Sequence, residues 1–277
     1  MKLLILGLGY TGRVVAGHMR AKGWEVRGTS RSAEKGLLQW PGCDISATLT
    51  WASHILVSAA PNENGDPFLA GLEADILAAA PAWLGYLSTT GVYGDHGGGW
   101  VDEATPLTPA TTRGRHRVKA EQQWMALHKA HGLPVHIFRL AGIYGPNRGP
   151  FAKVRGGTAR RIIKDNQVFS RIHVDDIAQV IAASIAQPNA GQIYNLCDND
   201  PAPPQDVIGH AAELLGLPMP PALDFETADL TPMARSFYAE SKKVSNTRIK
   251  EELGIRLRFP DYKSGLKALL AQERADT

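Results

Sequence analysis

The sequence has few of the features that support a disulfide framework, a metal site or a membrane anchor. Only two of its 277 residues are cysteines, Cys43 and Cys197, and they have neither motif spacing nor partners. We therefore expect a cytoplasmic, reducing location and no metal. No apolar run is long enough to cross a bilayer, because the best candidate, residues 76–87, is short and contains Pro81. We expect no membrane partner.

Neither sign of charge is in large excess. The chain has 30 Lys and Arg against 27 Asp and Glu, a net charge of +3. The arginines at positions 113, 115 and 117 have no aromatic residues interleaved with them, so no nucleic-acid partner is predicted. With 44% hydrophobic residues the chain can bury one large core or two unequal ones. A small-molecule substrate and a monomer or homodimer are expected.

What the sequence does contain is a glycine turn at its beginning. The apolar run of residues 3–6 predicts a buried strand, and residues 7–12 then match G-x-G-x-x-G ahead of an amphipathic segment. The first glycine permits the turn, the second lets a pyrophosphate approach the backbone, and the third allows close packing of helix on strand. The helix N-terminus would face the phosphates. The cofactor-binding residues predicted here are Gly7, Gly9, Tyr10, Thr11 and Gly12.

This stretch has two other interpretations. A Met-Lys start followed by apolar residues is typical of a signal peptide, but glycines break the run at once and no cleavage site follows. A glycine turn without a ligand is the second alternative. The segments that follow favour dinucleotide binding.

The end of the second predicted strand, residues 24–29, bears on the choice of cofactor. NAD sites of this kind place a carboxylate there to hold the ribose hydroxyls, whereas this chain has Ser30 and Arg31. A guanidinium pairs with a ribose 2′-phosphate, so NADP is preferred over NAD. The alternative is that Arg31 is a solvated surface residue. A further strand, residues 53–58, ends in small residues that would let a cofactor approach: Ser58, Ala59 and Ala60.

Several motifs in order resemble the extended short-chain dehydrogenase/reductase family, which includes sugar-nucleotide epimerases and dehydratases. They are the glycine turn, the small residues after the third strand, residues 88–94 (STTGVYG), residues 139–146 (RLAGIYGP) and residues 171–178 (RIHVDDIA). The resemblance covers nearly the whole chain. It implies an α/β fold: a Rossmann-type doubly wound parallel sheet with a smaller C-terminal substrate domain.

The same resemblance implies a division of the chain. Residues 1–148, completed by about 174–196, would form the NADP-binding Rossmann domain, and residues 149–173 and 197–277 the small substrate-binding domain. Leu140, at the exit of a strand, would line the nicotinamide side. Basic residues between 153 and 164 would suit a phosphate or carboxylate on the substrate, or form a solvated surface; both interpretations stay open.

In the family a Ser/Thr at the position of Thr89 binds the substrate oxygen, and a Tyr-x-x-x-Lys motif on the next helix supplies the acid–base pair. Lys119 is taken as the lysine, which would also bind the nicotinamide ribose. Arg115, four residues earlier, then stands in place of the tyrosine. A guanidinium cannot give up its proton, so the chain resembles the atypical branch with an eroded catalytic pair.

Arg115 would instead bind an anionic group or polarise a carbonyl. Tyr93 and Tyr144 are the nearest other proton donors, and packed tyrosines are the favoured interpretation of both. The sequence therefore predicts an NADP-dependent oxidoreductase or epimerase acting on a small polar carbonyl or hydroxyl compound, with an anionic substrate as one option. The alternative is a non-catalytic NADP-binding sensor or interaction protein.

Overall fold

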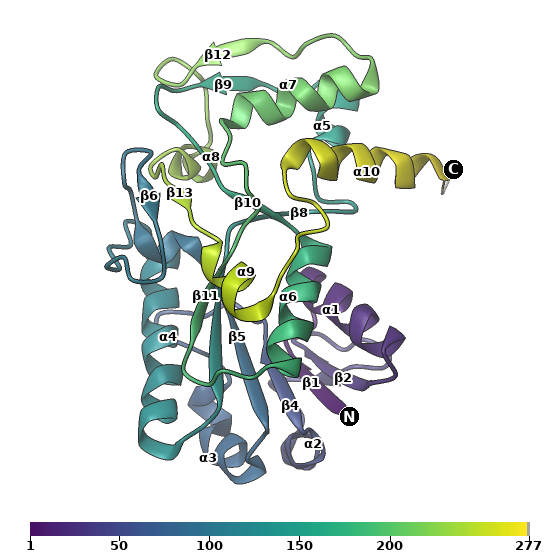
Figure 1. The fold of residues 1–277 in the computed structure, drawn as a ribbon, viewed down its shortest axis with the longest axis vertical. Helices are drawn as coiled ribbons and strands as arrows, with labels where there is room; N and C mark the ends of the chain where they lie inside the picture. The colour runs from purple at the N-terminus through teal and green to yellow at the C-terminus, as the bar shows by residue number, and fades with distance from the viewer. Residues whose placement is uncertain (276–277) are drawn as a thin grey trace.

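The computed structural model describes residues 1–275, with only the backbone described at Met233. It is an α/β fold whose largest sheet has seven strands in the order β11-β7-β5-β4-β1-β2-β3, and every neighbouring pair is parallel (Figure 1). The chain builds one half outward from β1 and then returns to place β4 on the other side of β1. The topological switch point therefore lies between β1 and β4, where ligands bind in open α/β sheets.

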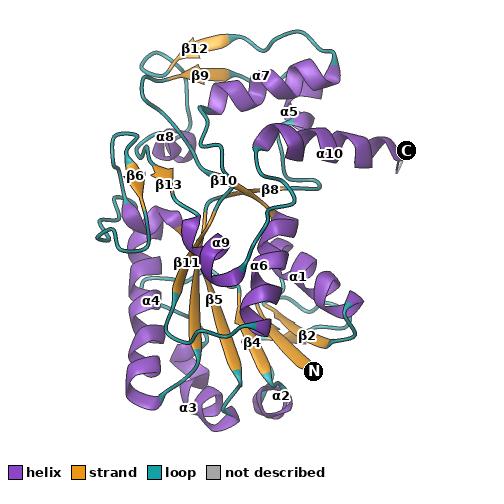
Figure 2. Ribbon diagram, in the orientation of Figure 1, coloured by secondary structure: helices purple, strands orange, loops and turns teal. Residues whose placement is uncertain are grey.

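The helices and strands, shown in Figure 2, are β1 (Lys2–Leu6), α1 (Tyr10–Ala21), β2 (Glu25–Ser30), β3 (Leu38–Gln39), α2 (Ser46–Trp51), β4 (His54–Val57), α3 (Leu69–Ala79), β5 (Trp83–Thr89), the short 3-10 helix η1 (Thr90–Tyr93), β6 (Trp100–Val101), α4 (Thr112–His131), β7 (Val135–Leu140), β8 (Gly142–Tyr144), α5 (Phe151–Arg155), β9 (Arg161–Ile163), β10 (Arg171–His173), α6 (Val174–Ala186), β11 (Ile193–Leu196), α7 (Pro204–Leu215), β12 (Ala222–Asp224), α8 (Pro232–Phe237), β13 (Lys243–Val244), α9 (Thr247–Leu253) and α10 (Tyr262–Ala275).

Side chains that alternate along the strands pack into two cores, one on each face of the sheet. Leu3 and Ile5 of β1 lie in a core with side chains of α1, α6 and α9, whereas Leu4 and Leu6 lie in a core with side chains of α2, α3 and α4. This is the two-fold periodicity of a strand that is buried on both faces. The predicted Rossmann-type doubly wound sheet is confirmed.

A third, smaller core joins parts of the chain that lie beyond the sheet. Its members come mainly from α5, α7 and α10, among them Phe151, Ala211 and Leu266. These elements sit above the carboxyl-terminal edge of the sheet in Figure 1, as the predicted smaller C-terminal unit requires. The exact limits of the two domains stay a prediction.

Candidate functional site

The carboxyl ends of the parallel strands bring the predicted cofactor residues to one edge. Gly7 follows β1, Ser30 ends β2, and Ser58 follows β4, its N–H donating to the carbonyl of the last residue of β1 over 2.9 Å. Thr89 and Leu140 are register partners at the ends of β5 and β7. Leu140 is buried. Residues separated by more than 130 positions therefore share one edge.

The glycine turn has the shape that a phosphate cradle needs. Gly7 has a φ of +88°, and a Cβ atom placed there would lie 2.9 Å from the backbone nitrogen of Ala59. A Cβ on Gly12 would lie 3.1 Å from Cγ2 of Ile5. At Gly9 a Cβ would meet nothing within 4 Å, and no side chain caps α1, which begins at the next residue. The N–H groups of the first helical turn are thus left to a ligand, and the residues present fit a pyrophosphate.

Tyr10 and Thr11 hold this turn in place. The hydroxyl of Tyr10 donates to the carbonyl of Pro146 over 3.0 Å, and the guanidinium of Arg148 lies 5.3 Å from the centre of its ring. Burial raises the pKa of Tyr10. Thr11 is buried at the start of α1. Their observed contacts are with the protein, so their predicted contact with the cofactor stays a prediction.

The end of β2 carries the charges that would meet the adenosine. Arg31 is exposed and its side chain has no partner among residues 1–275, while Ser30 Oγ lies 3.5 Å from Ser32 Oγ. The nearest carboxylate along the chain, Glu34, accepts two bonds from Arg13, at 2.6 and 2.8 Å. Glu34 is therefore engaged, whereas Arg31 remains available to an anion.

Helix α4 presents a different side chain to the strand ends than the one expected. The guanidinium of Arg117 donates to the carbonyls of Ala59 and Leu87 and to the hydroxyl of Tyr86, which is 3.1 Å away. Lys119 is exposed and donates to the carbonyl of Glu63 over 2.8 Å. Arg117 thus occupies the inner side of the helix, where Lys119 was expected. Residue type alone does not single out Arg117, because the family's motif has a lysine.

Arg115 also turns away from the sheet. Its guanidinium is exposed and bonds within its own helix start, to the carbonyl of Ala110 over 3.0 Å and to Oγ1 of Thr112 over 2.8 Å. Oγ1 of Thr89 accepts from the N–H of Gly91 over 3.2 Å, in the turn that begins η1. Among the described residues no hydrogen bond joins Thr89, Arg115 and Lys119. Their grouping as a catalytic trio stays a prediction.

Both tyrosines weighed as proton donors are packed. The hydroxyl of Tyr93 donates to Oδ1 of Asn195 over 2.7 Å and accepts from Arg139 over 2.9 Å, and burial raises its pKa. Arg139 in turn pairs with Glu121 at 2.8 Å, with both side chains at most 5% exposed. Burial likewise raises the pKa of Tyr144, whose hydroxyl lies 3.4 Å from a backbone carbonyl. Neither hydroxyl is placed to exchange a proton at the strand ends.

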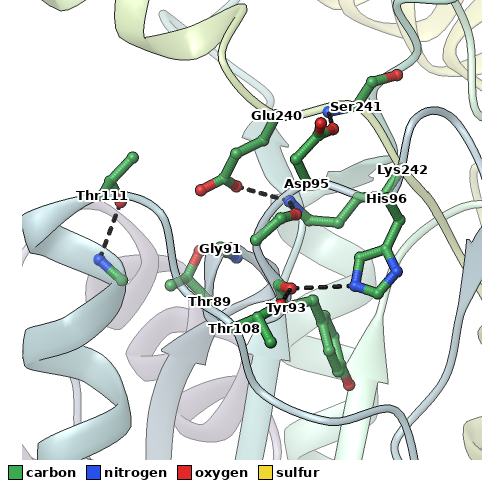
Figure 3. Close-up of polar contacts among 12 residues, drawn as sticks. Thr89, Gly91, Tyr93, Asp95, His96, Thr108, Thr111, Glu240, Ser241 and Lys242 are labelled. Carbon is green, nitrogen blue, oxygen red and sulfur yellow. Dashed lines mark hydrogen bonds and ion pairs between the residues drawn. The ribbon is translucent and has the colours of Figure 1, made fainter.

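A second missed feature comes from the C-terminal part of the chain. Nζ of Lys242, which is 8% exposed as a residue, donates to the carbonyl of Gly94 over 2.7 Å and lies 2.6 Å from Oε2 of Glu240. Figure 3 shows this pair above the Thr89–Tyr93 turn. The contact spans nearly 150 residues, and no local pattern in the sequence predicts it.

The basic residues between 153 and 164 are largely engaged with the protein. Arg155 pairs with Glu273, Arg161 donates to the carbonyl of Pro220, and Lys164 donates to the carbonyl of Tyr238. These bonds hold the smaller unit together. Of the two alternatives left open, an anion site here has no support from these three side chains.

Within residues 1–275, no three His, Cys, Asp or Glu side chains cluster as metal ligands. None of the helices in that part of the chain has the length and apolar character needed to span a bilayer.

With this geometry in view, the relatives of the chain are informative. The model of the NAD dependent epimerase/dehydratase family matches residues 74–197. Over this stretch the chain is similar to that family. A solved structure from Silicibacter pomeroyi DSS, described as a functionally unknown conserved protein, is 58% identical, with a TM-score of 0.93 over 98% of each chain.

More distant structures share the fold. The dTDP-glucose 4,6-dehydratase from Bacillus anthracis, solved in complex with NAD, has a TM-score of 0.81 at 19% identity over 100% of this chain and 97% of its own. The human epimerase family protein SDR39U1, solved with NADPH, has a TM-score of 0.79 at 19% identity over 98% and 99%. At these identities the likeness shows the fold alone, and it confirms the Rossmann-type architecture.

Proposed function

We propose that this protein binds NADP(H) and acts as an oxidoreductase or epimerase on a small polar carbonyl or hydroxyl compound. The observation that supports cofactor binding most directly is the turn at Gly7, whose backbone conformation and contact with Ala59 leave room for no side chain. Structures of the same fold with NAD and with NADPH support a nicotinamide cofactor of either kind. When bound, such a cofactor exchanges two electrons with a carbon of the substrate.

The preference for NADP over NAD rests on the adenosine end. The available cation there is Arg31, and the carboxylate Glu34 is already occupied by Arg13. Arg31 would attract a ribose 2′-phosphate, and no free carboxylate there would repel it. We therefore expect tighter binding of NADPH than of NADH.

The test is a titration of the purified protein with NADPH and with NADH, followed by nicotinamide fluorescence. Replacing Arg31 by Ala should weaken NADPH binding about 10- to 100-fold, the effect of losing charge-assisted hydrogen bonds of about 1.5–3 kcal/mol, and leave NADH binding unchanged. Lys35→Ala removes the same charge from the same exposed loop and is the matched control. Tighter binding of NADH than NADPH by the wild type would overturn the NADP assignment.

An anionic substrate is supported by one further side chain. Arg113 is exposed at the start of α4, next to η1, and has no side-chain partner among the described residues. Turnover is tested with matched neutral and phosphorylated carbonyl compounds: glyceraldehyde with glyceraldehyde 3-phosphate, and dihydroxyacetone with its phosphate, each with NADPH. A preference for the phosphorylated member of each pair is expected.

A non-catalytic NADP-binding sensor is the second candidate. It is favoured by the absence of a tyrosine on α4 and by the packing of Tyr93 and Tyr144. Tight NADPH binding without turnover of any of the four carbonyl compounds would support it over the oxidoreductase.

A further inference from the structure

The tyrosine of η1 and the arginines of α4 cannot serve as the acid–base group of the site. The hydroxyl of Tyr93 is held by Asn195 and Arg139 inside the core. The arginines of the first turns of α4 stay protonated at any ordinary pH and cannot exchange a proton. If the protein performs redox chemistry on a hydroxyl or carbonyl group, the proton must go to a different group.

The segment formed by residues 240–242 lies against the loop that follows η1. The N–H of Ser241 donates to Oδ1 of Asp95 over 2.8 Å, and its carbonyl accepts from the N–H groups of His96 and Gly98 at 3.1 and 2.9 Å. Lys243, immediately afterwards, pairs with Trp100 in the two-stranded β6–β13 sheet. The segment is therefore fixed on both sides of Lys242.

Glu240 is the residue of this segment whose side chain could bind a further group. Its Oε2 lies 2.6 Å from Nζ of Lys242, and its side chain is 11% exposed. Its other oxygen, Oε1, is buried and has no hydrogen-bond partner among the described residues. A buried carboxylate oxygen without a donor is costly, and native proteins rarely leave one unpaired. A bound hydroxyl group would supply the missing donor.

The direction of the side chain agrees with this assignment. In Figure 3 Glu240 extends from the C-terminal segment toward Thr89, with one carboxylate oxygen bonded to Lys242 and the other facing the Thr89 side. Lys242 also donates to the carbonyl of Gly94, the residue that closes η1, which fixes the pair relative to the end of β5. In this view the carboxylate lies on the side of the C-terminal segment that faces the turn holding Thr89.

We propose that Glu240 is the acid–base group of this site and that Lys242 positions it. Glu240 would then have the role that the tyrosine has in the family. This proposal rests on the oxidoreductase function above. In the oxidising direction, the substrate O–H bond breaks and its proton passes to Oε1 of Glu240. With a nicotinamide cofactor bound, its oxidised ring would take up the carbon's hydrogen with its electron pair, so the alcohol carbon would be oxidised to a carbonyl as the ring is reduced. In the reducing direction, protonated Glu240 returns the proton to the carbonyl oxygen.

The test compares Glu240→Gln with wild type in NADPH-dependent reduction of the four carbonyl compounds named above. General acid–base catalysis contributes 10²–10⁴-fold, so kcat should fall by about 100-fold or more. Glu240→Asp should recover part of the rate. Glu226→Gln, at an exposed glutamate elsewhere in the smaller unit, is the matched control and should keep the wild-type rate.

Readouts other than turnover separate an acid–base role from a structural one. NADPH affinity by fluorescence and the thermal midpoint of Glu240→Gln should stay close to wild type. In Lys242→Met the carboxylate loses its counter-ion, so the midpoint of the pH–rate profile should move to higher pH. Loss of turnover with unchanged NADPH binding, together with that pH shift, supports the proposal.

Two different results would overturn the assignment of Glu240, and only one of them also overturns the oxidoreductase function. If the wild type turns over a carbonyl compound and Glu240→Gln matches its rate and pH profile, Glu240 is not the acid–base group, and the oxidoreductase function stands. If the wild type binds NADPH but reduces none of the four compounds, the proposed oxidoreductase function fails and this proposal fails with it.

Discussion

The two halves of the candidate site each contain an arginine–glutamate pair, and the two pairs differ in every other respect. Arg13 and Glu34, beside the glycine turn, have side chains that are 51% and 41% exposed. Arg139 of β7 and Glu121 of α4 are 3% and 5% exposed, and Ser88 donates to the same glutamate over 2.5 Å. The first pair can open to a ligand at small cost. The second is part of the structure that supports the strand ends.

The two halves also differ in the chemical groups that would carry out their proposed functions. The cofactor half works through backbone groups, the N–H groups of a helix start and the close approach allowed by glycine, which follow from a local pattern of residues 7–12. The proposed acid–base half would depend on two single side chains, Glu240 and Lys242, from a segment near the far end of the chain. Family resemblance therefore predicts the first half better than the second.

The largest effect is expected from breaking the buried pair. Glu121→Gln leaves Arg139 buried beside a neutral amide, and the loss of one partner of a buried ion pair costs about 3–5 kcal/mol. Glu34→Gln breaks the exposed pair and should cost no more than about 1 kcal/mol. Urea unfolding of both variants measures the difference. Equal losses in the free energy of unfolding would show that burial does not distinguish the two pairs.

A smaller effect is expected when the backbone cradle is filled. Gly7→Ala places a methyl group 2.9 Å from the nitrogen of Ala59 at a φ of +88°, so the turn must shift. A positive φ costs a residue with a Cβ about 1–2 kcal/mol, which corresponds to a loss of about 5- to 30-fold in NADPH affinity.

The matched control is Gly17→Ala on the exposed side of α1, where a Cβ meets nothing within 4 Å. Its NADPH affinity should equal that of the wild type, as measured by the same fluorescence titration. Wild-type affinity in Gly7→Ala would place the cofactor phosphates away from this turn.

The sequence could predict elements with a clear local pattern, but not short elements or contacts between distant segments. The apolar runs of residues 3–6 and 53–58 predicted central strands correctly, because a strand buried on both faces has a continuous hydrophobic signature. The short elements β3 and α2, between residues 33 and 52, were left unassigned, since two to six residues carry little periodic signal. The docking of Lys242 on Gly94 depends on contacts between segments nearly 150 residues apart, and no motif spacing contains it.

The inward side chain of α4 differs from the one expected from the sequence for a geometric reason. Each residue advances the helix by 100°, so a shift of two residues turns a side chain by about 200°, to the opposite face. Lys119 was chosen by its type, a lysine, whereas the inward face at the strand ends belongs to Arg117. Residue type favours Lys119, whereas the helical face favours Arg117. The hydrogen bonds show that Arg117 is the side chain that lies inside.

The smallest predicted effect tests this correction directly. Arg117→Met removes the cation that holds the carbonyl of Ala59, a residue of the cofactor edge, with little change in side-chain length. Losing about 1 kcal/mol of hydrogen bonding should weaken NADPH binding about fivefold. Lys119→Met removes an equal charge from the outer face and should change the affinity less than twofold, because its observed partner is the carbonyl of Glu63. The reverse ranking in the fluorescence titration would return the family's lysine position to Lys119. An equal loss in both variants would mean that the cofactor senses only the net charge of α4, because neither side chain's contact would then matter.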